Sequence, residues 1–397
     1  MSPPVVVVAA LCARMLAESA LRAGWRVIVL DLFGDTDTRR ASGMWHSIGD
    51  AASLSIDPQR TREALDAASR TPNVIGWIAG AGFEAHRDLL DDRRVALATI
   101  GNTRESYDAV RDPARFFALL DDAGIPHPEM QLQAPVDVAG WLEKDANGTG
   151  GMHIRHAAQW HATDASRGGR YFQRHQPGRS MSALFIADTR KATIIGFNEQ
   201  LIVPHGGQPF VYGGAIGPVD VPDPVRQQIT VAVNAIVSRT RLKGLNSLDF
   251  IIDGERCFVL EVNARPSATM SLYERGSNRS LLSLHVRACA GASLDVDMSS
   301  AAAQTASLCG EQIVFADRDR TVSPEFVQRA LNLGWCHDIP VTGSFIAAGA
   351  PLCSVSAVCA HGTQTATVRA ELAARAATIA SIDTTRKPGH ADLILPR

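Results

Sequence analysis

The stretch from Leu248 to Pro266 constrains the fold of this chain most, because polar residues recur in it at positions where a buried strand is normally apolar. Its sequence is LDFIIDGERCFVLEVNARP. Two apolar runs flank Asp253-Gly254, a dipeptide that favours a tight reversal of the backbone. The stretch is therefore predicted to form a β-hairpin.

Four polar side chains are predicted to share one face of this hairpin. Asp249 opens the first strand, and Glu261 and Asn263 lie two residues apart in the second, so the twofold period of a strand turns that pair to the same side. Arg265 follows at the same interval. Converging oxygen ligands suit Mg²⁺, which usually shares its coordination shell with substrate phosphates. We therefore predict a magnesium site on these oxygens, with Arg265 facing an anion held there.

The alternative is a surface hairpin whose polar side faces water. The run after Asp249 and the run from Cys257 to Leu260 are almost wholly apolar, which indicates a hairpin covered on both faces. Charged groups in such a place need partners.

The pattern D-F-x-x-D-G-x-x-x-x-x-L-E-V-N-x-R-P, which begins at Asp249, resembles the metal-binding end of the ATP-grasp ligases. The resemblance implies that Asp249, Glu261 and Asn263 hold two Mg²⁺ ions on the phosphates of ATP. It also implies that Arg265 assists at the reacting centre.

A second feature precedes the hairpin by about a hundred residues. A strand ends on Lys144 and leads into Asn147-Gly148-Thr149-Gly150-Gly151. A lysine supplies a compact charge, and glycines let backbone N–H groups close around phosphate oxygens. The loop is not a P-loop, since no Gly-Lys-Ser/Thr follows, and a plain hairpin connection is the alternative. Within the resemblance it corresponds to the ATP-grasp lid, with Lys144 as the nucleotide-phosphate lysine.

The chain departs from the family pattern at three positions of the nucleotide site. Gln173 and Ser180 stand where acidic residues commonly bind adenine and ribose, and Arg174 adjoins them in the predicted nucleotide site. Both replacements can hydrogen-bond, but neither is a charged acceptor. Pro113 replaces a phosphate-contacting lysine, and either neighbouring arginine, Arg111 or Arg115, could take over that contact.

The first third of the chain is predicted to be β-α-β, with strands at Val5–Ala10 and Arg26–Leu30. The turn after the first strand, Ala9–Arg14, has no glycine, which argues against dinucleotide binding. A further strand, Val74–Ala79, leads into a flexible loop at Gly80–Glu84, where ligands often bind in open α/β sheets. This region resembles the pre-ATP-grasp domain, which implies these substrate-side candidates: Asp31, Phe33, Asp35, Asp37, Phe83, Glu84, Gly101 and Asn102.

The length of 397 residues predicts two or three domains. We place an α/β pre-ATP-grasp domain at 1–110, an ATP-grasp domain of two α+β lobes at 111–302 and a small β-rich domain at 303–397. The glycine-rich stretch His205–Pro218 is predicted to be an irregular loop.

Composition excludes several classes of partner and location. The 39 basic and 41 acidic residues predict no binding to nucleic acid or to a charged membrane surface. The apolar run Val5–Ala13 is too short to span a bilayer and lacks the basic region of a secretory signal. Seven cysteines without a Cys-x-x-Cys pair favour a reducing, cytoplasmic location.

These observations predict an ATP- and Mg²⁺-dependent ligase that joins a small-molecule carboxylate to an amine through an acyl phosphate and acts as a homodimer. The small hydroxyl residues after Arg265-Pro266 resemble the amino-acid ligases more than the carboxylating members. One specific hypothesis is the addition of glutamate during biosynthesis of a pterin- or furan-type one-carbon carrier. The alternatives are a carboxylase of the purine or biotin type and an inactive nucleotide-binding protein.

Overall fold

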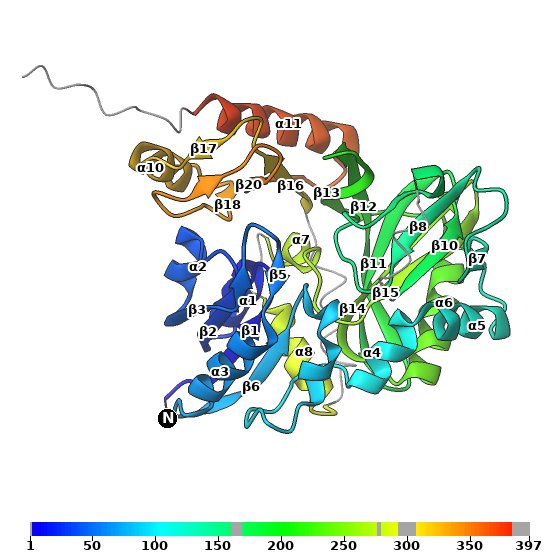
Figure 1. Ribbon diagram of the computed structural model, residues 1–397, viewed down its shortest axis with the longest axis horizontal. Helices are drawn as coiled ribbons and strands as arrows, with labels where there is room; N and C mark the ends of the chain where they lie inside the picture. The colour runs from blue at the N-terminus through cyan, green and yellow to red at the C-terminus, as the bar shows by residue number, and fades with distance from the viewer. Residues whose placement is uncertain (1, 160–168, 276–278, 293–306, 383–397) are drawn as a thin grey trace, which may run out of the picture.

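The first domain is built on a four-stranded parallel sheet, which lies at the lower left of Figure 1. The computed structural model describes residues 2–159, 169–275, 279–292 and 307–382. The sheet has the order β3-β2-β1-β6, and its strands are β1 (Val5–Ala9), β2 (Arg26–Asp31), β3 (Met44–Ser47) and β6 (Val74–Ala79). The buried valines of β1 explain why it is a central strand.

The strand order of this sheet reverses at β1. The chain passes from β1 to β2 and β3 on one side and then returns to place β6 on the other side. Ligands bind at such a switch point, beside the carboxyl ends of the strands. Helices and short segments complete the region: α1 (Arg14–Arg22), α2 (Thr36–Ala41), β4 (Gly49–Asp50), β5 (Ser55–Ile56), α3 (Pro58–Ser69), the 3₁₀ turns η1 (Phe83–Ala85) and η2 (Arg87–Asp91), and α4 (Arg104–Arg111).

A small antiparallel sheet follows at the right of Figure 1. Helix α5 (Pro113–Asp122) leads into it, and the sheet has the order β7-β10-β8-β9. Its elements are β7 (Met130–Gln131), β8 (Trp141–Asp145), β9 (Arg155–His156), the 3₁₀ turn η3 (Ala157–Gln159) and β10 (Arg170–Arg174). We call this sheet the lid sheet.

Eight of the remaining strands form one antiparallel sheet in the order β15-β14-β11-β12-β13-β16-β20-β18, which we call the central sheet. Its strands are β11 (Arg179–Asp188), β12 (Ala192–His205), β13 (Gln208–Val219), β14 (Lys243–Asp253), β15 (Arg256–Asn263), β16 (Ser307–Phe315), β18 (Cys336–His337) and β20 (Pro351–Ala360). The C-terminal strands thus extend the same sheet that carries the predicted metal hairpin. A separate pair joins β17 (Arg320–Thr321) to β19 (Phe345–Ile346).

Helices cover the central sheet and its C-terminal extension. They are α6 (Asp223–Thr240), α7 (Met270–Glu274), α8 (Leu281–Cys289), α10 (Pro324–Asn332) and α11 (Thr365–Ser381). Helix α11 crosses the top of the molecule in Figure 1 and packs on β16 and β20. Within the described residues, no helix has the length and apolar character needed to cross a bilayer.

The prediction of an irregular loop at His205–Pro218 is wrong. Most of this stretch is β13, which forms a hairpin with β12 and then pairs with β16. The reversal is Gly206-Gly207, where both residues have positive φ angles of 57° and 79°. A Gly-Gly pair between two runs is itself a hairpin signal, and the many glycines that follow obscured it.

Asn102 joins the first domain to the central sheet. Its side-chain nitrogen donates to the carbonyl of Ala264 at 2.9 Å and to Asn246 Oδ1 at 2.8 Å, while its oxygen accepts from the backbone N–H of Lys243 at 2.7 Å. Asn102 was a substrate-side candidate, but these bonds use its amide to hold the backbone around the hairpin of β14 and β15.

We predict that Asn102→Ala lowers the free energy of unfolding by about 2–3 kcal/mol, because it leaves buried backbone groups without partners. Urea unfolding followed by circular dichroism measures this change. Gln133→Ala, at an exposed position, is the control and is expected to change the midpoint very little. Equal midpoints for the two variants would contradict the structural role of Asn102.

Candidate active site

The predicted metal ligands come together on the hairpin of β14 and β15. Asp249 and Glu261 are directly opposite each other in the register of the two strands. The side-chain nitrogen of Asn263 donates to Asp249 Oδ2 at 3.2 Å. The twofold period that predicted a shared face therefore describes the hairpin correctly.

The two carboxylates have different electrostatic environments. Burial and the neighbouring charge of Glu261 raise the pKa of Asp249 to about 7. Burial also acts to raise the pKa of Glu261, but the positive charges of Arg111 and Lys144 outweigh it and hold that pKa below its usual value. Arg111 and Lys144 thus place positive charge on the Glu261 side of the pair. At Asp249 the charge of Arg265 does not outweigh the effect of burial. A hard divalent cation such as Mg²⁺ fits this set of carboxylate and amide oxygens.

Lys144 and Gln173 meet in the lid sheet, above the hairpin. Lys144 Nζ donates to Gln173 Oε1 at 2.7 Å, and both side chains are buried. Burial lowers the pKa of Lys144, although the charges of Glu261 and Asp249 oppose the shift. The Gln173 Nε2 group is buried and has no hydrogen-bond partner among the described residues. A buried donor without a partner is suited to an acceptor atom of a bound ligand.

The glycine-rich loop packs tightly against its surroundings. A Cβ atom at Gly148 would lie 2.1 Å from the ring of His153, and one at Gly151 would lie 1.9 Å from the carbonyl oxygen of Phe210. The carbonyl of Gly150 accepts a hydrogen bond from the backbone N–H of Tyr212 at 2.9 Å. The loop therefore contacts β13 of the central sheet, and its glycines allow this approach.

Arg265 connects three parts of the chain. Its Nε donates to Glu84 Oε1 at 2.7 Å, and its Nη2 donates to Asn263 Oδ1 at 3.2 Å and to Thr149 Oγ1 at 3.4 Å. Glu84 follows β6 at the switch point of the first sheet and is almost fully buried. Burial would raise the pKa of Glu84, but the charges of Arg265 and Arg111 hold it below its usual value.

Arg111 completes the site from the end of α4. Its guanidinium lies 3.2 Å from Glu261 Oε2 and donates to the carbonyls of Ala146 and Gly148 at 3.1 Å and 2.7 Å. Arg111 therefore contacts both a predicted metal ligand and the glycine-rich loop.

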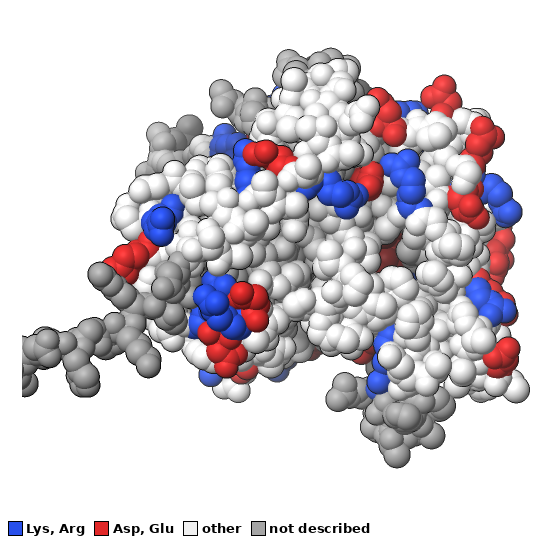
Figure 2. All heavy atoms as spheres, turned by 90° about the horizontal axis from the view of Figure 1, so that it is seen from above, with Lys and Arg blue, Asp and Glu red and all other residues white. Residues whose placement is uncertain are grey.

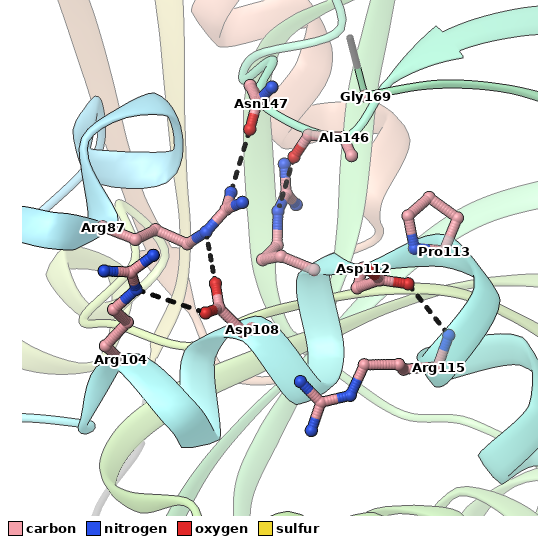
Figure 3. Close-up of a pocket in the computed structure, with 10 residues that line it drawn as sticks. Arg87, Arg104, Asp108, Asp112, Pro113, Arg115, Ala146, Asn147 and Gly169 are labelled. Atoms are coloured by element: carbon pink, nitrogen blue, oxygen red, sulfur yellow. Dashed lines mark hydrogen bonds and ion pairs between the residues drawn. The ribbon is translucent and has the colours of Figure 1, made fainter.

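A cavity of about 340 Å³ lies on the other side of Arg111, between α4, α5 and the lid sheet (Figure 3). Its charged lining consists of Arg87, Arg104, Asp108, Arg111, Asp112 and Arg115. Arg87 donates to Asn147 Oδ1 at 2.9 Å and pairs with Asp108 at 2.6 Å, which ties the first domain to the lid. The four arginines against two aspartates make this cavity suited to anions.

Comparison with known proteins identifies the domain that carries this site. Residues 110–269 match the family model of the ATP-grasp domain. The chain contains an ATP-grasp domain. The resemblance to the ATP-grasp ligases, which was predicted from the pattern that begins at Asp249, is thus confirmed.

Two solved structures share the fold over most of the chain. The biotin carboxylase domain of Hydrogenobacter thermophilus 2-oxoglutarate carboxylase, a dimer in complex with MgADP, ADP and bicarbonate, is 14% identical with a TM-score of 0.67 and covers 88% of this chain and 85% of its own. L-amino acid ligase from Bacillus licheniformis is 13% identical with a TM-score of 0.64, and the match covers 94% of this chain and 98% of the ligase.

One curated protein matches in sequence. The large chain of the arginine-specific carbamoyl phosphate synthase of Bacillus subtilis is 22% identical over an alignment of 259 residues. The alignment covers 61% of this chain. The match spans 25% of that protein, so this chain corresponds to about a quarter of its length.

The structure places Arg174 and Ser180, two predicted nucleotide residues, differently relative to the predicted metal ligands. Arg174 is exposed, stacks over Trp141 and donates to the carbonyl of Ala139, so its side chain is turned away from Lys144 and Gln173. Ser180 lies on β11 and donates to Gln200 Oε1 at 2.7 Å. Gln200 also hydrogen-bonds the Asp249 carboxylate, and this bond partly opposes the rise in the pKa of Asp249.

Sequence reasoning missed Gln200, because it lies in a long apolar strand far from the hairpin. It also gave Phe83 a substrate role, whereas Phe83 is fully buried and its ring lies 5.4 Å from that of Trp77. Phe83 is therefore a core residue.

The raised pKa of Asp249 predicts a pH dependence of stability in the metal-free protein. Between pH 4 and 7 the folded protein keeps a proton on Asp249 that the unfolded chain has lost, so this residue makes stability fall as pH rises. Asp249→Asn removes the effect. We expect the variant to be as stable as wild type near pH 4 and more stable by up to about 4 kcal/mol at pH 8, in buffers with EDTA.

Urea titrations at several pH values measure this difference. Asp253→Asn, at the exposed turn of the same hairpin, is the control and is expected to follow wild type. A constant difference between Asp249→Asn and wild type from pH 4 to pH 8 would contradict the assigned cause.

Proposed function

We propose that this protein is an ATP- and Mg²⁺-dependent ligase that joins a carboxylate to an amine through an acyl phosphate and releases ADP and phosphate. The observation that carries the proposal is the convergence of Asp249, Glu261, Asn263 and Arg265 at one partly buried point, beneath a lid that carries Lys144. The match of the fold to an L-amino acid ligase over nearly its whole length supports it.

Each group at this point has a role in the proposal. Asp249, Glu261 and Asn263 would hold two Mg²⁺ ions, and Lys144, Gln173 and the glycine-rich loop would bind ATP. When bound, the ions would neutralise charge on the phosphates. Phosphoryl transfer depends mainly on positioning and on this neutralisation of charge, so the chain needs no protein nucleophile.

The proposed reaction has two steps. An oxygen of the substrate carboxylate attacks the γ-phosphorus of ATP, the bond to the bridging oxygen breaks, and ADP leaves. The amine nitrogen then attacks the carbonyl carbon of the acyl phosphate, phosphate leaves and the nitrogen loses a proton. Arg265 is placed to stabilise the charge that develops, because its pair with Glu84 and its bond to Asn263 fix its guanidinium.

A carboxylase is the second candidate. The observation that favours it is the likeness of the fold to a biotin carboxylase domain in complex with bicarbonate. In this case bicarbonate would take the place of the substrate carboxylate. The third candidate is an inactive nucleotide-binding protein. It rests on Pro113, Gln173 and Ser180, which replace residues that bind the nucleotide in the family pattern. Arg111 weakens it, because this arginine supplies a positive charge beside the glycine-rich loop although the lysine is missing.

The proposal includes a cytoplasmic homodimer. All seven cysteines are free thiols, which is usual in a reducing compartment. Dimerisation is supported by the Hydrogenobacter domain, which is described as a dimer. In the face seen in Figure 2, basic and acidic side chains are interspersed, as expected of a protein whose partners are small molecules.

The assay for the function is Mg²⁺-dependent release of ADP and phosphate from ATP. Carboxylates and amines are added singly and in pairs, and bicarbonate is tested separately. Glutamate is the first carboxylate to test, because it belongs to the cofactor-biosynthesis hypothesis, and tyramine is among the amines. ADP release that needs both an acid and an amine is the result expected of a ligase. Release that depends on bicarbonate would favour the carboxylase.

We predict that Glu261→Gln lowers the rate of ADP release by at least about a hundredfold and leaves the fold intact, because an amide is a poor replacement for a carboxylate on Mg²⁺. Circular dichroism and the assay above measure the two effects. Glu255→Gln, in the exposed turn of the hairpin, is the control and is expected to retain activity. Near-normal turnover by Glu261→Gln would contradict the metal assignment.

We predict different effects for the two arginines beside Pro113. Arg111→Ala is expected to lower kcat/KM for ATP by at least about tenfold, since it removes the charge that contacts Glu261 and the glycine-rich loop. Arg115→Ala is expected to change it less than about twofold, because that side chain is exposed and makes no hydrogen bond to the site within the described residues. Steady-state kinetics separate the two. Equal losses would contradict a specific role of Arg111 and would mean that both arginines of the cavity contribute to ATP binding.

A further inference from the structure

A second cluster of charged groups lies where the first domain meets the C-terminal strands. We call it the acidic recess. Its members come from the loop after β1, from α1, from the start of α2, from β16 and from the turn after β18, and they are Cys12, Arg14, Asp35, Asp37, Glu311 and Asp338. The proposed reaction has not used any of them.

Three acidic side chains of the recess have bonding partners. Asp338 accepts from Arg14 Nε at 2.6 Å and from the thiol of Cys12 at 3.1 Å. Asp37 accepts from the backbone N–H groups of residues 338 and 339, at 2.8 Å and 3.0 Å. Glu311 accepts from Arg14 Nη2 at 2.9 Å and from Arg275 at 2.6 Å. These bonds hold the three acidic side chains in place.

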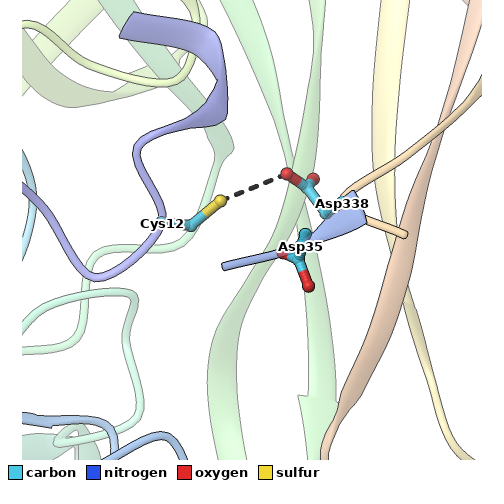
Figure 4. Close-up of side chains that lie close together, drawn as sticks. All are labelled: Cys12, Asp35 and Asp338. Atoms are coloured by element: carbon cyan, nitrogen blue, oxygen red, sulfur yellow. Dashed lines mark hydrogen bonds between the residues drawn. The ribbon is translucent and has the colours of Figure 1, made fainter. Parts of the chain in front are cut away.

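Asp35 differs from the others. Its side chain has neither a hydrogen bond nor an ion pair within the described part of the chain, although the residue is only 6% exposed. One of its carboxylate oxygens lies within 4.8 Å of both Cys12 Sγ and a carboxylate oxygen of Asp338 (Figure 4). Burial, and then the charges of Asp338 and Asp37, raise the pKa of Asp35 well above its usual value. A buried carboxylate without a partner is costly, and a cation would relieve that cost.

An ammonium group suits the recess better than a metal ion. Arg14 already donates to both oxygens of Asp338, so a metal ion would compete with a bound guanidinium. Burial and the charge of Asp338 raise the pKa of the Cys12 thiol, which keeps it protonated and unsuited to metal binding. An ammonium group needs only acceptors for its N–H donors, and Asp35 has free acceptor oxygens.

The recess lies on the same face of the central sheet as the metal ligands. Glu311 is opposite Ala215, Ala215 is opposite Gln200, and the side chain of Gln200 bonds Asp249. Ser271, in the segment that follows Arg265, donates to Glu311 Oε2 at 2.9 Å. A substrate bound in the recess would therefore lie on the face of the central sheet that carries the reacting centre.

We propose that the acidic recess binds a positively charged amino group of the amine substrate, with Asp35 as its ion-pair partner. This inference rests on the proposed ligase function and makes the second substrate a cationic amine. Asp35 would act in binding and not in chemistry.

Calorimetric titration of the full-length protein tests the inference. The probes are 1,4-diaminobutane and its neutral counterpart 1,4-butanediol, in the presence of Mg²⁺ and a non-hydrolysable ATP analogue. We expect saturable binding of the diamine but not of the diol, and at least tenfold weaker diamine binding by Asp35→Asn. The affinity for the ATP analogue is expected to stay unchanged. Asp122→Asn, which removes one exposed charge, is the control and is expected to bind like wild type.

Thermal melting of the unliganded variants shows whether Asp35 has a structural role. The Asp35 side chain makes no capping hydrogen bond to α2. Asparagine keeps the shape of aspartate and removes an unpaired charge, so the melting temperature is expected to be unchanged or higher. Asp35→Ser provides a second variant that lacks the charge. A fall in melting temperature in both variants would overturn the binding role in favour of a structural one.

Other outcomes would also overturn the inference. These are equal binding of diamine and diol, equal diamine binding by wild type and Asp35→Asn, and zinc binding that depends on Asp35 in a protein that ignores the diamine. If the diamine fails but ADP release still requires some other amine, the ligase function stands and the recess is not its amine site. If wild type does not bind the ATP analogue, the proposed function itself fails.

Discussion

The site is organised by the repulsion between two half-buried carboxylates, Asp249 and Glu261, that are held side by side on one hairpin. A charge in such a place must be neutralised, and the chain does so unequally. Glu261 receives the charges of Arg111 and Lys144, while Asp249 receives two neutral amides, those of Gln200 and Asn263. The remaining negative charge is what makes this point suited to a divalent cation.

The groups that balance the pair come from separate parts of the chain. Arg111 lies at the end of α4, Lys144 on the lid sheet, and Glu84, which holds Arg265, at the end of β6. Each bond therefore fixes one structural unit to the hairpin as well as placing a charge. The contacts that join the first domain and the lid to the hairpin are therefore also contacts of the site.

The sequence predicted those parts of the site that depend on local spacing. The hairpin, the shared face of Asp249, Glu261 and Asn263, and the strand that ends near Lys144 all follow from period and turn residues, and the structure has them. Gln200 could not be found in this way, because its contact with Asp249 depends on the pairing of β12 and β11 with β14. Arg111 could be named only as one of two arginines. The choice depends on how the end of α4 and the start of α5 are placed relative to Glu261.

The same argument explains why the acidic recess was not recognised. Asp35 and Asp37 were named as substrate-side candidates, but nothing in the sequence linked them to Asp338, which lies about three hundred residues away. Their proximity requires the C-terminal strands to extend the central sheet past β13, which depends on the stretch that was mistaken for a loop. Once β13 pairs with β16, Glu311 is brought to the face that carries Asp249. The central sheet then carries, on one face, a cluster with excess negative charge and a site suited to phosphates and their metal ions. That is the arrangement that a reaction between an anionic and a cationic substrate requires.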